Sequence, residues 1–159
     1  MAYDFRYKFR VSFHETDMAG IAHFANYFRY MEQAEHEFLR SLGTSVHDTG
    51  RDVSVSWPRV QTDCTFSAPL RFNDEVEIHL IVCEKRRRSI RYGFLFYKQG
   101  TDQQGIGQPV AQGSVTVVCV AIDPTTQIMK AVAIPDYIGD LIEAAPQEII
   151  EKLAESRKT

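Results

Sequence analysis

The chain has 159 residues, of which 44% are hydrophobic and 25% are charged, and its formal net charge is -3 at pH 7. These values suit one soluble domain over residues 1-159, and no apolar run approaches the roughly 20 residues that a membrane span needs. A slightly acidic protein is also a poor candidate for binding nucleic acid through its overall charge. We therefore expect a globular protein without a membrane span or a nucleic-acid partner.

The N-terminal segment has the alternation of a strand with one buried face. Between Arg6 and His14 the apolar side chains fall at every second position, at Phe9, Val11 and Phe13. The first residues lack the basic start and apolar stretch of a secretory signal. We therefore predict a strand here and a cytoplasmic location for the protein.

A loop follows that carries Asp17 and Gly20 directly ahead of a predicted helix. The backbone N–H groups in the first turn of a helix have no intrahelical acceptors, and the helix dipole places about half a positive charge there. A carbonyl oxygen docked on these groups is polarised, so Asp17 could attack that carbonyl or activate a water that does. The loop therefore suggests a hydrolytic site.

The predicted helix runs from about residue 24 and ends before Gly43. Its apolar residues recur at spacings of three and four, which is typical of a helix that packs against a sheet; they are Phe24, Tyr27, Phe28, Met31, Ala34, Phe38, Leu39 and Leu42. We expect these side chains to be core. His23, at the helix start, is expected either to cap and pack the helix or to form a hydrogen bond with substrate or water.

The rest of the chain is rich in β-branched and aromatic residues separated by turn residues. We predict strands at residues 53–56, 60–66, 75–82, 90–97 and 110–122, and a peripheral amphipathic helix at 146–157. One long helix followed by antiparallel strands indicates an α+β fold in which the sheet wraps around the helix.

One basic cluster stands out, formed by residues 85–88 and Arg91. It is either a solvated turn between two strands or, through Arg86, Arg88 and Arg91, a site for phosphate groups, because arginine offers paired donors to phosphate oxygens. The histidines lack metal-ligand spacing, and we expect neither a metal nor a cofactor. The widely spaced Cys64, Cys83 and Cys119 are expected to be reduced thiols.

Three segments resemble the 4-hydroxybenzoyl-CoA thioesterase family of hotdog-fold proteins: Phe13-His14-Glu15-Thr16-Asp17-Met18-Ala19-Gly20-Ile21-Ala22-His23-Phe24-Ala25-Asn26-Tyr27, the block from Cys64 to Val76, and the block from Ala111 to Asp123. The resemblance covers roughly residues 5 to 135 and implies a hotdog fold. It also implies hydrolysis of acyl-CoA or aroyl-CoA, with coenzyme A as part of the substrate.

The resemblance further implies the roles of individual residues. Asp17 corresponds to the catalytic carboxylate, and a backbone N–H near His23 and Phe24, most simply that of Phe24, corresponds to the donor to the thioester oxygen. The family's site lies between two protomers, so we expect a homodimer or a dimer of dimers. The residues expected to approach or wall the substrate are Gly20, Asn26, Tyr27, Trp57 and the 57–67 region.

Two other functions fit parts of this pattern. An (R)-specific enoyl-CoA hydratase also uses an Asp and a His from one loop, but its signature has Asp-x-Asn-Pro and a His five positions on, whereas His23 lies six positions after Asp17. A noncatalytic acyl-binding hotdog protein is the other alternative, against which the intact Asp17 argues. The sequence leaves open the acyl group and whether Asp17 acts as nucleophile or general base.

Overall fold

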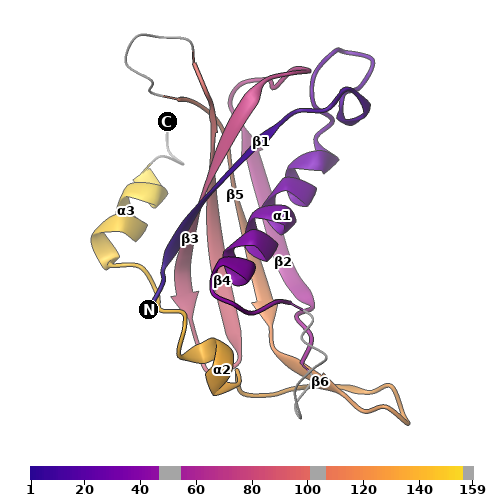
Figure 1. Ribbon diagram of the computed structural model, residues 1–159, viewed down its shortest axis with the longest axis vertical. Helices are drawn as coiled ribbons and strands as arrows, with labels where there is room; N and C mark the ends of the chain where they lie inside the picture. The colour runs from indigo at the N-terminus through magenta and orange to yellow at the C-terminus, as the bar shows by residue number, and fades with distance from the viewer. Residues whose placement is uncertain (47–54, 101–106, 156–159) are drawn as a thin grey trace.

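The computed structural model describes residues 1–46, 55–100 and 107–155, and it shows an antiparallel sheet with one long helix across one face (Figure 1). The sheet contains β1 (Asp4–Arg10), β2 (Arg59–Phe66), β3 (Glu75–Lys85), β4 (Ser89–Lys98) and β5 (Gln108–Val118). Their order is β1-β3-β4-β5-β2, and every neighbouring pair is antiparallel. This is the α+β arrangement that the sequence predicts.

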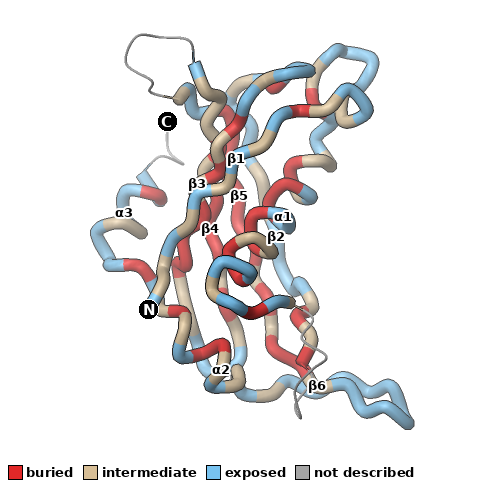
Figure 2. Tube along the Cα trace, viewed as in Figure 1, coloured by how far each residue is buried: buried red, intermediate tan, exposed pale blue. Residues whose placement is uncertain are grey.

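The helix α1 (Ala25–Ser41) packs its apolar face on the sheet. Its buried side chains are Tyr27, Tyr30, Met31, Ala34, Phe38 and Leu39, none more than 3% exposed, and they face the inner sides of β3, β4 and β5. The sheet lets the helix come close at Gly113, where a Cβ would lie 2.6 Å from the Met31 sulfur. Figure 2 shows the buried residues concentrated on the central strands and on α1.

A second helix, α3 (Gln147–Glu155), covers part of the outer face of the sheet. Leu153 packs at Gly93 of β4, where a Cβ would lie 2.7 Å from a Leu153 methyl carbon. With α3 in place, Ile81 and Cys83 on this outer face are buried as well, which is why the alternation of β3 breaks near its end. The predicted C-terminal helix is confirmed.

The first predicted strand is too long. β1 ends at Arg10, and the chain then forms a 3-10 turn, η1 (Phe13–Glu15), that leaves Phe13 75% exposed instead of buried. The turn forms because Ser12 and Glu15 make a capping box, in which the Ser12 N–H donates to the Glu15 carboxylate.

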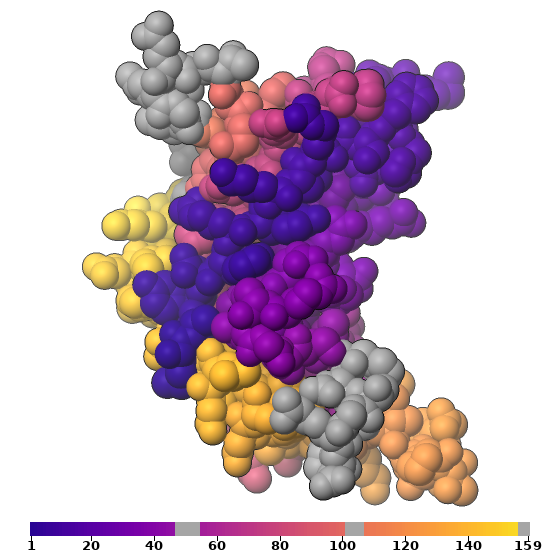
Figure 3. All heavy atoms as spheres, in the orientation of Figure 1, coloured from indigo at the N-terminus to yellow at the C-terminus, as the bar shows by residue number. Residues whose placement is uncertain are grey.

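The predicted strand at 110–122 is in fact two strands. β5 ends at Val118, and β6 (Val120–Ile122) pairs with β7 (Met129–Ala131) in a separate small sheet. The change of sheet occurs at Cys119, whose N–H donates to the Arg88 carbonyl of the β3–β4 turn. Figure 3 shows the resulting hairpin, in orange, projecting from the lower end of the molecule.

The loop with Asp17 and the β3–β4 turn lie at opposite ends of the sheet (Figure 1). A short helix, α2 (Asp136–Gly139), lies near that turn. The helix α1 ends as predicted, because Gly43 has a φ of +76° that few other residues adopt. The predicted strand at 53–56 lies partly outside the described residues; Ser56 forms a bridge with Val120. Among the described helices, none has the length and apolar character that crossing a membrane requires.

Candidate active site

The loop between η1 and α1 folds back on itself. The Asp17 N–H donates to the Ile21 carbonyl at 2.9 Å, and the His23 N–H donates to the Glu15 carbonyl at 2.9 Å. A third bond, from the Ala22 N–H to the Leu70 carbonyl at 2.7 Å, ties the loop to the segment that follows β2. Backbone hydrogen bonds therefore hold the loop in two ways: some join its two ends to each other, and one joins it to the segment after β2.

Asp17 lies on the exposed side of this loop. Its Oδ1 accepts a hydrogen bond from the Ala19 N–H at 2.8 Å, which fixes the side chain in a tight turn. Gly20 closes the turn with a φ of +73°, a conformation that favours glycine, and its N–H donates to the Asp17 carbonyl at 2.9 Å. The geometry of this turn is enough to explain why a glycine is found at position 20. The close approach of Gly20 to substrate stays a prediction.

The start of α1 leaves one backbone donor free. Across the residues that the structure describes, no acceptor is found for the Phe24 N–H. The neighbouring N–H groups all donate to acceptors in the molecule, namely those of His23, Ala25, Asn26 and Tyr27. Among these donors at the helix start, that of Phe24 is therefore the one for which the described residues provide no acceptor.

His23 caps the helix. Its Nδ1 accepts the Ala25 N–H at 3.2 Å, and its ring contacts the Phe24 ring with centroids 4.6 Å apart. Since Nδ1 accepts, the proton of the neutral ring is on Nε2. The structure thus gives His23 the capping and packing role, and a hydrogen bond from its ring to substrate stays a prediction.

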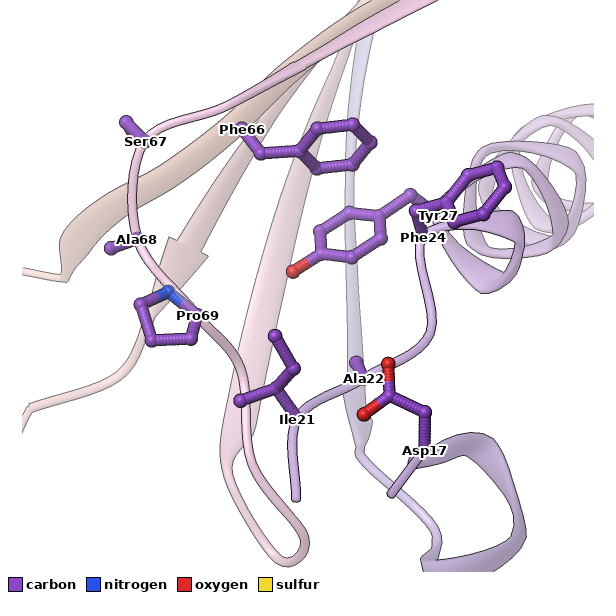
Figure 4. A pocket seen from close by; sticks show the side chains of 9 residues that line it. All are labelled: Asp17, Ile21, Ala22, Phe24, Tyr27, Phe66, Ser67, Ala68 and Pro69. Atoms are coloured by element: carbon purple, nitrogen blue, oxygen red, sulfur yellow. The ribbon is translucent and has the colours of Figure 1, made fainter. Parts of the chain in front are cut away.

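A pocket of about 490 Å³ opens beside the loop (Figure 4). Its walls are mostly apolar and come from the loop, the start of α1 and the end of β2 with the segment after it; they are Asp17, Ile21, Ala22, Phe24, Tyr27, Phe66, Ser67, Ala68 and Pro69. In Figure 4 the Asp17 carboxylate turns toward the side of the pocket where Ala22 and Ile21 are drawn. Asp17 and Phe24 therefore line one mostly apolar pocket.

Tyr27 forms the back of this pocket and is 3% exposed. Burial raises the pKa of its hydroxyl to about 12, with a smaller contribution from Cys64. Its ring meets the Phe66 ring edge-on, with centroids 4.8 Å apart. Tyr27 is therefore a neutral aromatic wall at any physiological pH, in the position that the sequence predicts.

The structure does not bring Asn26 or Trp57 to this pocket. Asn26 turns toward the loop, where its Nδ2 donates to the Glu15 carbonyl at 2.7 Å. Trp57 is 7% exposed in the core beside the start of β2, whereas the pocket lies at Phe66, the end of that strand. The Asn26 side chain thus holds the loop, and the Trp57 side chain packs in the core.

The basic cluster is remote from the pocket of its own chain. Arg86 and Arg88 occupy the β3–β4 turn, and Arg91 lies on β4 just beyond it. β3 has 11 residues, so its two ends are about 33 Å apart at about 3.3 Å per residue. The turn between strands is confirmed, and a phosphate role for these arginines would require the pocket of a second protomer.

Other titratable groups lie outside the pocket. Cys64, Cys83 and Cys119 are not joined by disulfide bonds, and burial raises the pKa of Cys64 to about 12 and that of Cys119 to about 11. Over residues 1–46, 55–100 and 107–155, no group of three or more His, Cys, Asp or Glu side chains is placed to hold a metal ion.

Sequence reasoning missed two parts of the site. Ile21, Ala22, Ala68 and Pro69 line the pocket, and only the family-like block from Cys64 to Val76 hinted at the last two. From the sequence, Glu15 was also assigned no role. The spacing of Ser12 and Glu15, a serine followed three residues later by a glutamate, is a capping-box signal that could have identified its role.

Comparison with known proteins gives the family. The model of the Thioesterase-like superfamily matches residues 11–145. A putative esterase of Aquifex aeolicus is 38% identical over 95 residues, which are 60% of this chain and 73% of that protein. A 1,4-dihydroxy-2-naphthoyl-CoA hydrolase of Thermosynechococcus vestitus is 24% identical over 146 residues, 92% of this chain and 93% of that protein.

Solved structures agree in fold. The gentisyl-coenzyme A thioesterase BH1999 superposes with a TM-score of 0.70 at 30% identity, covering 84% of this chain and 98% of that one. The 4-hydroxybenzoyl CoA thioesterase of Pseudomonas sp. strain CBS-3 superposes with a TM-score of 0.72 at 21% identity, covering 88% and 99%. Both the predicted family and the predicted hotdog fold are confirmed. The chain belongs to the thioesterase-like superfamily of hotdog-fold proteins, and it is a thioester hydrolase.

Proposed function

We propose that this enzyme hydrolyses acyl-CoA or aroyl-CoA thioesters, with Asp17 as the catalytic carboxylate and the Phe24 N–H as the donor to the thioester oxygen. The observation that carries the proposal is that Asp17 and Phe24, whose N–H is free, line the same apolar pocket. The named relatives support it, since they act on a naphthoyl-CoA and a gentisyl-coenzyme A. No cofactor is needed for this chemistry.

The pocket suits a thioester whose carbonyl oxygen accepts the Phe24 N–H. Attack on the carbonyl carbon forms a C–O bond and moves an electron pair onto that oxygen, where the donor and the helix dipole stabilise it. Collapse then breaks the C–S bond. Coenzyme A leaves as a thiolate, and because a thiol has a pKa near 8.5, no separate acid is required to protonate it.

Asp17 can serve this reaction in two ways. As a nucleophile it forms an acyl anhydride that water hydrolyses; as a general base it takes a proton from the attacking water. Both need the carboxylate in its ionised form, and a positioned base contributes about 10²–10⁴ in rate. A single turnover in H₂¹⁸O separates the two when ¹⁸O enters the Asp17 carboxylate, because general-base catalysis puts ¹⁸O only in the product acid; if water attacks the acyl carbon of the anhydride, chemical trapping of the acyl group on Asp17 identifies the nucleophilic route.

The replacement Asp17→Asn tests the assignment. It keeps the side-chain shape and removes the charge, so kcat should fall at least ~10²-fold while KM changes little, because the lost interaction acts in the transition state. Glu15→Gln is the matched control, since Glu15 is the other carboxylate of the loop. A variant Asp17→Asn with near wild-type activity, together with an inactive Glu15→Gln, would show that the wrong carboxylate was chosen.

The residues that line the pocket limit the kinds of acyl group that it can bind. Phe24, Tyr27 and Phe66 present aromatic surfaces, and Ile21 and Pro69 add aliphatic ones. Such walls favour a benzoyl-like or short aliphatic group over a charged one. A hydrolysis screen over acyl-CoA chain lengths and aroyl-CoAs, with a crotonyl-CoA hydration assay alongside, measures this preference directly.

We also propose a homodimer, or a dimer of dimers, in which β2 of each protomer meets β2 of the other. β2 is an edge strand, and its Val60 and Phe66 side chains are 60% and 45% exposed. Exposed apolar edge strands are normally covered. Because Phe66 also lines the pocket, a partner on this edge would complete the pocket wall.

The oligomer is tested with Val60→Lys, which places a charge on the β2 edge. Light scattering should show the wild type as a dimer or tetramer and the variant shifted to lower mass, with lower kcat/KM. Ile128→Lys, at a side chain that is 56% exposed in the β6–β7 hairpin, is the control and should change neither. A wild-type monomer that is fully active at assay concentration would contradict the proposal.

A further inference from the structure

Glu15 lies in the loop beside the pocket and does not line the pocket. It nevertheless takes part in more hydrogen bonds than any neighbouring residue of the loop. It lies at the end of η1, two residues before Asp17. Its side chain and its backbone carbonyl each accept two hydrogen bonds, from four different residues, which are Ser12, His23, Asn26 and Tyr30. The proposed reaction gives Glu15 no role, so these hydrogen bonds need another explanation.

The Glu15 carboxylate ties the loop to the body of α1. Its Oε2 accepts the Ser12 N–H at 2.8 Å and the Tyr30 hydroxyl at 3.0 Å. Tyr30 is 1% exposed, and burial together with this hydrogen bond raises the pKa of its hydroxyl above the ordinary value. The hydroxyl therefore remains protonated and keeps donating to Glu15 over the whole working pH range.

The Glu15 carbonyl joins the two halves of the site. It accepts the His23 N–H at 2.9 Å and the Asn26 Nδ2 at 2.7 Å. Asp17 follows two residues after Glu15, and Phe24 follows directly after His23. Glu15 is therefore bonded to both parts of the chain: the part that carries the Asp17 carboxylate and the part that carries the Phe24 N–H.

We propose that Glu15 is a positioning residue that sets the separation between the Asp17 carboxylate and the Phe24 N–H, acting through Tyr30 and Asn26. This inference rests on the proposed function, because it assigns Asp17 and Phe24 their roles. Such a residue matters for rate, since a misplacement of about 1 Å in a reacting group can cost ~10²-fold. It matters less for substrate binding, which depends on the apolar walls.

The test compares Glu15→Ala with Glu15→Gln. The alanine variant removes the acceptor for Ser12 and Tyr30, and kcat should fall about 10- to 100-fold with KM within about threefold of wild type. The glutamine variant keeps an oxygen that can accept both donors, so it should retain kcat within about fivefold. Tyr30→Phe, which removes one of the two donors, should lie between them.

Asp123→Ala is the matched control. Like Glu15, Asp123 has a carboxylate that accepts two hydrogen bonds, in its case from the Thr125 and Thr126 N–H groups, both at 2.8 Å, but it lies in the β6–β7 hairpin. It should lose stability without losing kcat. If Glu15→Ala lowers kcat no more than Asp123→Ala does, or if Glu15→Gln loses as much as Glu15→Ala, the positioning role is overturned; the second result would mean that the charge itself acts in catalysis.

A measurement without substrate separates this inference from the proposed function. Amide hydrogen exchange of His23 should be at least tenfold faster in Glu15→Ala than in wild type, and unchanged in Asp123→Ala. Unchanged exchange in Glu15→Ala would overturn the inference even in an active enzyme. A wild-type protein that hydrolyses no acyl-CoA or aroyl-CoA would overturn the proposed function instead, whatever the exchange result.

Discussion

Glu35 should make the stability of this protein fall as the pH rises toward neutrality. It lies within α1, is 1% exposed, and faces the guanidinium of Arg59 on β2, with 2.7 Å between Oε2 and Nη2. Burial raises the pKa of Glu35 to about 7, and the charge of Arg59 offsets only part of that effect. Neither the pocket nor the proposed chemistry uses this group.

The size and sign follow from linkage. In the unfolded chain the Glu35 pKa is 4.5, and in the folded protein it is about 7, a difference worth about 3 kcal/mol. Between these values the folded state holds a proton that the unfolded state has lost. The stabilisation is therefore complete below pH 4.5 and is lost as the pH rises through about 7.

The perturbation is Glu35→Gln, which is neutral at every pH. Urea unfolding from pH 4.5 to pH 8 should show the free energy of unfolding of the wild type falling by about 3 kcal/mol relative to the variant. Burial lowers the pKa of His36, which acts in the opposite direction, but His36 is present in both proteins and its effect cancels in the difference.

Glu32→Gln provides the control for this measurement. Glu32 contacts the same guanidinium of Arg59 at 3.3 Å, but its side chain is 47% exposed. Its removal should change stability by no more than about 1 kcal/mol, and the fall of stability with pH should persist, because burial is a larger cause of the raised Glu35 pKa than the charge of Glu32. Parallel curves for wild type and Glu35→Gln across this range would refute the reasoning, because they would mean that Glu35 is ionised throughout or reaches solvent.

Two further changes test the packing of α1 and the basic turn. Gly113→Ala should destabilise the protein by about 1–3 kcal/mol in a thermal melt, because the new Cβ would meet Met31 and the Asp63 carbonyl below 3 Å; an unchanged melt would mean that α1 can shift away. The double replacement Arg86→Ala/Arg88→Ala should raise KM a few-fold for coenzyme A thioesters and leave truncated pantetheine thioesters unaffected. Equal loss for both substrates, or none, would leave these arginines as a solvated turn.

The helix, the positions of most strands along the chain and the loop with Asp17 were predictable because their signals are local. The spacing of apolar residues in α1 follows directly from 3.6 residues per turn, and Gly43 marks its end. β3 and β4 alternate over most of their lengths because one face of each meets α1. The loop with Asp17 is recognisable because its carboxylate, its glycine and the helix start lie within a few residues of one another.

The remaining features depend on contacts between residues far apart in the sequence. A pattern of alternating residues continues past Arg10; the local capping box of Ser12 and Glu15 ends the strand, and the bond from the Tyr30 hydroxyl to Glu15, which only the folded chain shows, ties this turn to α1. Likewise, β5 and β6 read as one apolar run, and the Arg88 carbonyl decides where the chain changes sheets.

The sequence by itself determined the fold class, the family and the position of the candidate carboxylate, because these are written in short motifs and in periodicity. Only the tertiary structure decided which helix-start donor is free, since that depends on Glu15 and His23 taking up the neighbouring N–H groups. It also placed the basic turn at the end of β3 that lies away from the pocket, since the registers set the pocket residue Phe66 level with Ile78, near the start of that strand. The physical reason is that the position of a hydrogen-bond acceptor, or of the far end of a strand, depends on how the whole chain folds. The local sequence pattern does not contain that information.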